Sequence, residues 1–376
     1  MLTIKRIVKY LLYLLVLVLC AIFLIMKFSD SKANLVLQTD MWRNYPTPVI
    51  SPDIIHLQDS LPKFKRPVSN TYMTYPEWYI VYSAKEYADF LKINAPSSFP
   101  YFSSISQYWW SYKTINKIIE THFKNASKEQ LMLIVIGTSF SLEYFLKGIY
   151  ENTIGKITEL LSVQNTTDED IYAQRIANDY YNFVLEKPWF EFPFATSLAG
   201  LWSQTSLVGP YMIRKLERKF ILSLEYSIKS IYALIIRIGS TITYGAADSS
   251  IYALANNIPN DLFQKNINIH EIKKINNFNS IVSLPSQQPF TETLIKVLNN
   301  NIKFINISGN YEILVTALAP INWKYQNKYG QLIFTMEVLT HPGLQRIALR
   351  VRTESLVRTL EYLKLNNAKI EHVYPY

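Results

Sequence analysis

The chain has 376 residues, of which 49% are hydrophobic and 14% aromatic, and its formal net charge is +9. This composition is ample for packed cores and excludes an intrinsically disordered chain. Glycine is scarce, with ten residues and none before Gly137, which argues against the glycine-rich loops that bind dinucleotides or nucleoside triphosphates. The basic residues are scattered and no nucleic-acid-binding motif accompanies them, so we expect no nucleic acid partner.

The first 28 residues predict a transmembrane signal anchor. Lys5, Arg6 and Lys9 precede an uncharged run from Tyr10 to Met26, which as a helix spans roughly 26 Å, close to the thickness of a bilayer's hydrocarbon core. No small-residue cleavage site follows the run, and Cys20 lacks the small preceding residue of a lipoprotein signal, so we expect the anchor to stay uncleaved. The basic flank predicts a cytoplasmic N-terminus in the inner membrane and an extracytoplasmic body.

The rest of the chain divides by composition into four segments. Residues 29–70 contain five prolines and no glycine, which predicts an extended tether. Residues 71–256 repeat apolar side chains at helical spacing and predict a mainly helical domain. Residues 257–279 are polar and rich in asparagine, as in a linker between domains. Residues 280–376 alternate short β-type runs with helices, so the fold class is α+β with an N-terminal transmembrane helix.

Two segments of the C-terminal domain resemble each other. Thr291–Leu298 reads TETLIKVL and Thr353–Leu360 reads TESLVRTL, and each leads through an Asn-Asn pair to a strand that begins near Lys303 or Lys369. Threonine with an acid in the next position is typical of a helix start, so we expect each threonine to be an N-cap. Two strand–helix–strand halves predict a ferredoxin-like domain. Chance similarity between two helix starts is the alternative.

The stretch from Arg214 to Ile238 predicts a helix with two different faces. Its basic residues Arg214, Lys215, Arg218 and Lys219 precede the apolar run that begins at Phe220. A basic face beside a wide apolar face suits a helix in the membrane interface, with basic side chains at the lipid phosphates. A core helix with one solvated stripe and a full membrane span are the alternatives. Membrane lipid is therefore an expected partner.

Three glutamates in apolar surroundings are the candidate catalytic residues. They are Glu77 within Tyr75-Pro-Glu-Trp-Tyr79, Glu143 four residues before Lys147, and Glu191 between aromatic neighbours. A carboxyl group in an apolar pocket has a raised pKa and suits general acid catalysis. Each glutamate also has a structural explanation: a capping box from Thr74 to Glu77, an ion pair of Glu143 with Lys147, and an outward-facing loop position for Glu191.

The sequence predicts neither a metal site nor a cofactor. The five histidines are far apart, and the single cysteine lies inside the apolar N-terminal run. We therefore predict a single-pass envelope protein that acts as a binding or assembly module, with membrane lipid and an envelope protein as partners, rather than an enzyme. The alternative is a carboxylate-dependent enzyme that acts on an envelope lipid or glycan.

Overall fold

The computed structural model describes most of the chain, and the described residues belong to two compact units. The described residues are 9, 13, 16, 19–25, 27, 30–37, 48–61, 64–123, 127–163, 165–243, 250–259, 262 and 268–375. We call the first unit the helical unit; it comprises Met1–Ser31, Pro76–Tyr112 and Leu131–Gly245. The mixed unit comprises Lys32–Tyr75, Lys113–Gln130 and Ala246–Tyr376. Helices and two antiparallel sheets confirm the predicted α+β class.

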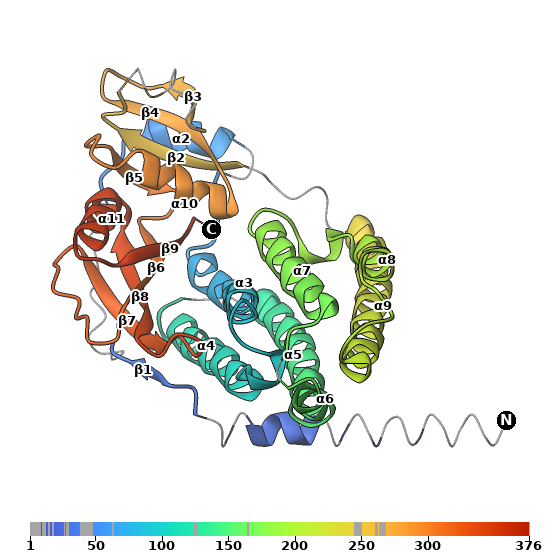
Figure 1. The fold of residues 1–376 in the computed structure, drawn as a ribbon. Coiled ribbons are helices and arrows are strands. Elements are labelled where there is room, and N and C mark those ends of the chain that lie inside the picture. The colour runs from blue at the N-terminus through green and yellow to red at the C-terminus, as the bar shows by residue number, and fades with distance from the viewer. Residues whose placement is uncertain are drawn as a thin grey trace. The chain divides into compact units, whose positions relative to one another are not determined.

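The mixed unit contains two antiparallel sheets (Figure 1). One has the strand order β3-β4-β2-β5 and the other the order β1-β7-β8-β6-β9. The strands are β1 (Ala33–Leu35), β2 (Ser250–Asn256), β3 (His270–Lys274), β4 (Asn279–Pro285), β5 (Lys303–Ile307), β6 (Glu312–Pro320), β7 (Gly330–Glu337), β8 (Leu344–Arg352) and β9 (Lys369–Tyr374). Helices α10 (Gln287–Lys296) and α11 (Leu356–Leu365) share one hydrophobic core with side chains of both sheets.

The two sheets repeat one connectivity. Along the chain, the elements β2-β3-β4-α10-β5 are followed by β6-β7-β8-α11-β9, which have the same order of strands and helix. When each strand of the first set is replaced by its counterpart in the second, the sheet order β3-β4-β2-β5 becomes β7-β8-β6-β9. The similar segments Thr291–Leu298 and Thr353–Leu360 lie in equivalent places, in α10 and at the start of α11. The structure differs from the expected ferredoxin-like domain, because each half completes a four-stranded sheet of its own. In each half an additional strand, β2 or β6, lies between the two strands that flank the helix.

Each repeated threonine joins its helix to the last strand of the other repeat. The Thr291 hydroxyl accepts a hydrogen bond from the Val373 backbone N–H of β9 at 2.9 Å, and the Thr353 hydroxyl donates one to the Ile305 carbonyl of β5 at 3.0 Å. Both threonines are almost completely buried. Neither threonine is an N-cap as we expected, because α10 already begins at Gln287, and Thr353 opens a 3-10 turn that precedes α11, whose N-cap is Ser355. The shared threonine therefore connects the two repeats.

Replacing Thr291 or Thr353 with valine is expected to lower the free energy of unfolding by about 1–3 kcal/mol, because each change leaves a buried backbone group without its partner. Urea unfolding of the full-length protein in detergent measures this. The matched control is Thr359→Val, since the Thr359 hydroxyl donates to the carbonyl of Ser355, the residue immediately before α11 in the same repeat. Equal effects at all three threonines would show that the contact between repeats has no special weight.

Two predicted connections contain regular structure. The tether, residues 29–70, includes β1, which pairs with the β7 edge, and helix α2 (Pro52–Ser60). The linker, residues 257–279, includes β3, an edge strand whose five residues are all exposed. A strand exposed on both faces has no apolar alternation to reveal it. The anchor, residues 1–28, lies largely outside the described residues, although Leu19–Ile25 within it is helical.

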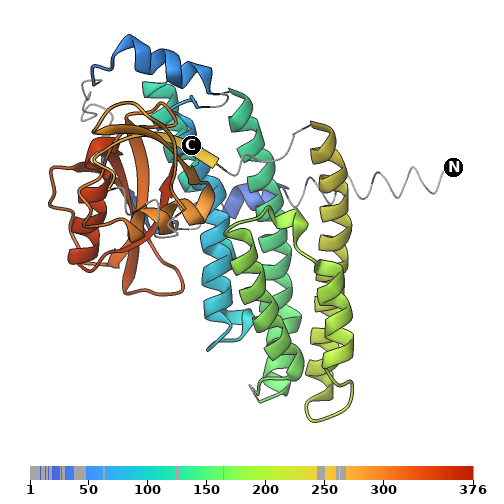
Figure 2. The ribbon, with the colours of Figure 1, turned by 90° about the horizontal axis from the view of Figure 1, so that it is seen from above.

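The helical unit is built from long helices that run alongside one another (Figure 2). They are the main parts of α3 (Asn70–Phe90), α4 (Tyr101–His122) and α5 (Ser127–Tyr150), a π-helical turn (Glu151–Gly155), α6 (Lys156–Leu161), α7 (Asp168–Val184), α8 (Phe194–Gln204) and α9 (Met212–Thr243). Aromatic side chains fill much of the space between them, and the largest buried ones include Tyr79, Tyr101 and Tyr108.

Candidate functional site: the ionic interior, apolar surface and groove of the helical unit

Helices α5 and α9 face each other through charged side chains. The Lys147 ammonium lies 2.7 Å from a Glu225 carboxylate oxygen, and the Lys229 ammonium lies 2.9 Å from Glu143 and 2.8 Å from Glu225. The i,i+4 contact between Glu143 and Lys147 is present at 3.4 Å. We call these four residues the Lys147 cluster. Two cations and two carboxylates compensate each other, so Glu143 is held by ion pairs in this arrangement.

A second ionic group, the Arg218 cluster, continues the same interface toward α7. It consists of Glu151, Asp170, Arg214, Glu217 and Arg218. The Arg218 guanidinium lies 2.8 Å from Glu151 and 3.3 Å from Asp170, and the Arg214 guanidinium lies 3.1 Å from both Asp170 and Glu217. Both arginine side chains are only 2% exposed. A buried charge is tolerated when it is paired and hydrogen-bonded, and the cluster provides those partners.

The π-helical turn between α5 and α6 shapes the Arg218 cluster. It contains Glu151 and ends at Gly155, whose carbonyl accepts a hydrogen bond from Arg214 at 3.0 Å. A Cβ at Gly155 would lie 2.4 Å from a Glu151 carboxylate oxygen, so a side chain here would collide with the carboxylate. Single π-helical turns interrupt α-helical hydrogen bonding and occur often at functional sites. Here the turn provides a carbonyl for an arginine and room for a carboxylate.

The four basic residues that we expected at the membrane surface lie inside the helical unit. Besides Arg214 and Arg218, the Lys215 ammonium lies 2.8 Å from Asp168, and Lys219 donates to the Thr205 carbonyl at 2.9 Å. All four are at most 5% exposed. The acidic run Asp168–Asp170 at the start of α7 draws them inward, since its carboxylates are their partners.

The outer face of α9 is apolar along most of its length. Leu216, Phe220, Leu224, Ile228, Ile231, Leu234, Ile235 and Ile238 are between 45% and 65% exposed. They follow helical spacing on the side away from the charged residues. Helix α9 thus has most of its charged side chains inside the unit, with Arg237 exposed, and a wide apolar face outside, while Leu222, Tyr226 and Ala233 pack into the core.

The segment that contains α5 and α6 shares this distribution. Its exposed large apolar side chains are Leu131, Met132, Ile134, Val135, Leu146, Ile149, Ile154, Ile157, Leu160 and Leu161, and the polar Asn152 and Thr153 are exposed beside them. Gln130–Leu161 is also the one stretch among the described helices that is long and apolar enough to cross a membrane. Exposed apolar surface of this extent on a folded chain is typical of an interaction site for lipid or protein.

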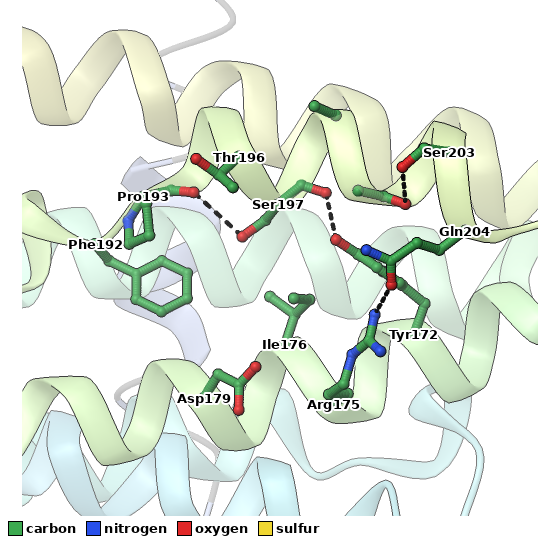
Figure 3. A pocket seen from close by; sticks show the side chains of 12 residues that line it. Tyr172, Arg175, Ile176, Asp179, Phe192, Pro193, Thr196, Ser197, Ser203 and Gln204 are labelled. Carbon is green, nitrogen blue, oxygen red and sulfur yellow. Dashed lines mark hydrogen bonds between the residues drawn. The ribbon is translucent and has the colours of Figure 1, made fainter.

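A groove of about 560 Å³ runs between α7 and α8 (Figure 3). From α7, Arg175 and Asp179 rise one helical turn apart toward α8. The Arg175 guanidinium donates to the Gln204 side chain and lies 4.8 Å from the centre of the Tyr172 ring. Among the described residues, Asp179 has neither a hydrogen bond nor an ion pair. Ile176 and Phe192 provide apolar lining. The groove thus combines opposite charges at its rim with an apolar interior.

The three candidate glutamates do not form one site. Glu143 belongs to the Lys147 cluster, and Glu191 is exposed on a 3-10 turn (Trp189–Glu191). Glu77 is half-buried on α3, and no hydrogen bond or ion pair in the described part of the chain connects the three. The predicted capping box is absent, because α3 begins at Asn70 and the Thr74 hydroxyl bonds back to the Asn70 carbonyl. Burial raises the pKa of Glu77 to about 7.

The stability of the helical unit is expected to fall between about pH 4.5 and 7. The unfolded chain loses the Glu77 proton near the ordinary glutamate pKa, whereas the folded chain keeps it up to the raised pKa of about 7. As the pH rises through this range, ionisation therefore increasingly favours the unfolded chain, and the loss of stability is complete above it. Glu77→Gln should therefore increase the free energy of unfolding at pH 8 by up to about 3 kcal/mol and leave it unchanged at pH 4.5. Urea unfolding at both pH values measures this.

Glu191→Gln is the control, because Glu191 is exposed and its replacement should leave the stability unchanged at both pH values. A Glu77→Gln protein that is less stable than the wild type at pH 8 would contradict the expectation. It would show that the ionised carboxylate has a favourable partner.

Several residues of these sites escaped the sequence analysis. Asp168, Asp170, Glu217, Arg175 and Asp179 were not singled out, although the acidic run that opens α7 and the basic run that opens α9 are complementary in charge and could have indicated their contact. Within the described residues, no group of three or more histidine, cysteine, aspartate or glutamate side chains could hold a metal ion. No family model, curated protein or solved structure matches the chain.

Proposed function

We propose that the chain is a membrane-integrated protein of the cell envelope whose helical unit lies against lipid and which acts there as a binding or assembly module. The proposal includes the N-terminal signal anchor of residues 1–28 and a body outside the cytoplasm. Membrane lipid is the first partner, and an envelope protein is the second.

The observation that carries the proposal is the inverted distribution of polarity in the helical unit. Apolar side chains cover the outer face of α9, while Arg218 and its ionic partners are inside. In water this arrangement loses the benefit of burying apolar surface and adds the cost of burying charge. In a membrane, contact between the apolar face and lipid is favourable, and ionisable residues within membranes typically face the protein interior.

The dimensions of the apolar face agree with this placement. Phe220 to Ile238 covers roughly 27 Å along the axis of α9, close to the roughly 30 Å thickness of a bilayer's hydrocarbon core. Gln130–Leu161 provides a second apolar helical stretch in the same unit. The enzymatic alternative has weaker support, because Glu77, Glu143 and Glu191 occupy three different environments.

Cysteine accessibility in the full-length protein tests the proposal. In a Cys20→Ser background, we would compare Ile228→Cys on α9 with Lys364→Cys on the exposed surface of α11. A membrane-impermeant maleimide is added to membranes opened by sonication and, separately, to protein in detergent. We expect Ile228→Cys to be protected in membranes and Lys364→Cys to react in both preparations. Equal, rapid labelling of Ile228→Cys in both preparations would overturn the proposal.

A further inference from the structure

We propose that the groove between α7 and α8 binds the headgroup of a zwitterionic phospholipid with a primary ammonium, the phosphoethanolamine class, together with the first part of an acyl chain. This inference rests on the proposed function, because it takes its ligand from the membrane that the helical unit contacts. It goes further in that it assigns the lipid class and the residues that select it.

The first argument is the charge pattern at the rim. Arg175 and Asp179 are four residues apart, so their side chains share one face of α7, and both are exposed. The two side chains do not form an ion pair with each other. Instead the guanidinium is positioned by Gln204 and the Tyr172 ring, and the carboxylate has neither a hydrogen bond nor an ion pair among the described residues. A fixed cation and an available anion one turn apart match a ligand that carries both charges.

The second argument is the chemistry of the two headgroup charges. A guanidinium binds phosphate oxygens with two parallel hydrogen bonds, and a carboxylate accepts hydrogen bonds from a primary ammonium. A phosphocholine headgroup has no N–H to donate to Asp179. A phosphoglycerol headgroup has no cation, so the Asp179 carboxylate would stay without a counter-charge while the phosphate lies on Arg175. Phosphoethanolamine satisfies both ends of the rim.

The third argument is the interior of the groove. Small side chains of α8, among them Thr196, Ser197 and Ala199, line the space, and Gly200 makes room for the Tyr172 side chain, because a Cβ there would lie 2.3 Å from the Tyr172 hydroxyl oxygen. That hydroxyl is itself fixed by a 2.7 Å hydrogen bond to the Ser197 carbonyl. Ile176 and Phe192 offer apolar contacts. The volume of about 560 Å³ is within the usual range of ligand sites and suits a headgroup with the first part of a chain, while the rest of the chain stays in lipid.

Native mass spectrometry of the full-length protein in detergent tests the inference. Delipidated protein is mixed with equal amounts of dioleoyl phosphatidylethanolamine, phosphatidylcholine and phosphatidylglycerol, and the retained lipid is counted. We expect the wild type to retain phosphatidylethanolamine at least tenfold over the other two lipids. Asp179→Asn should reduce its retention to that of phosphatidylcholine, and Arg175→Gln should remove retention of all three.

Unchanged phosphatidylethanolamine preference in Asp179→Asn and Arg175→Gln would overturn the inference. So would displacement of the lipid by an equal concentration of free O-phosphoethanolamine, because the ligand would then be a soluble phosphomonoester. The cysteine labelling of Ile228→Cys is independent of the groove. Protection there combined with no lipid preference would reject this inference alone, whereas rapid labelling in membranes would reject the proposed function itself.

Discussion

Replacement of Arg218 by glutamine is expected to lower the free energy of unfolding by about 3–5 kcal/mol, the largest effect of any single change considered. The guanidinium is 2% exposed and faces Glu151 at 2.8 Å and Asp170 at 3.3 Å. Without it, both carboxylates remain in the interior of the helical unit with one cation fewer to compensate them. The cost comes from these uncompensated charges more than from the ion pairs themselves.

Urea unfolding in detergent, followed by circular dichroism at 222 nm, measures the change. Arg175→Gln is the matched control: the same substitution in the same unit, but at an exposed arginine whose contacts with Gln204 and the Tyr172 ring lie at the surface, so a loss of at most about 1 kcal/mol is expected. A loss below about 1 kcal/mol for Arg218→Gln would contradict the expectation and would mean that water or rearranged side chains solvate the two carboxylates.

In the protein without its N-terminal anchor, residues 29–376, Ile228→Asp is expected to reduce partitioning into vesicles roughly 100-fold. Ile228 is 57% exposed on the outer face of α9, and an aspartate at the centre of a lipid-facing helix costs about 3 kcal/mol, with a factor of ten for each 1.4 kcal/mol. The same substitution on a water-exposed helix would change stability by only about 0.5 kcal/mol. Vesicle flotation therefore separates a lipid-facing surface from an ordinary exposed one.

The controls for this experiment are Ile228→Leu, which keeps the apolar face, and Lys364→Asp on the exposed surface of the mixed unit. Both should float with the vesicles as the wild type does. If Ile228→Asp floated equally well, the outer face of α9 would not contact lipid, and association with membranes would depend on other parts of the chain.

The sequence predicted the two faces of α9 but not their environments. Helical spacing separates Arg214 and Arg218 from Phe220 and Ile228, and the structure has this separation. Periodicity states only that two faces differ; it does not state which face is inside. That choice depends on the acidic run at Asp168–Asp170, which approaches α9 only in the folded chain. The placement of the basic residues at lipid phosphates therefore differed from the structure.

Local pairs could be predicted better than distant ones. The contact between Glu143 and Lys147 follows from spacing on one helix, whereas their partners Lys229 and Glu225 are more than seventy residues away in sequence. The similarity of the segments at Thr291 and Thr353 indicated two equivalent halves, but not the additional strand in each sheet. Strand β3 was missed because all five of its residues are exposed, so hydrophobic alternation is absent.

The threonine contacts between the repeats make each half of the mixed unit incomplete by itself. The hydrogen-bond partner of Thr291 lies in β9, and that of Thr353 lies in β5. Each half therefore holds a hydrogen-bonding group that the other half requires. Sequence separations of 82 and 48 residues between these partners mean that large loops must close before the contacts form. Folding dominated by such distant pairings is slow, and a nascent chain that has emerged only as far as β5 still lacks strand β9. The mixed unit therefore reaches its native state only after β9 has been synthesised.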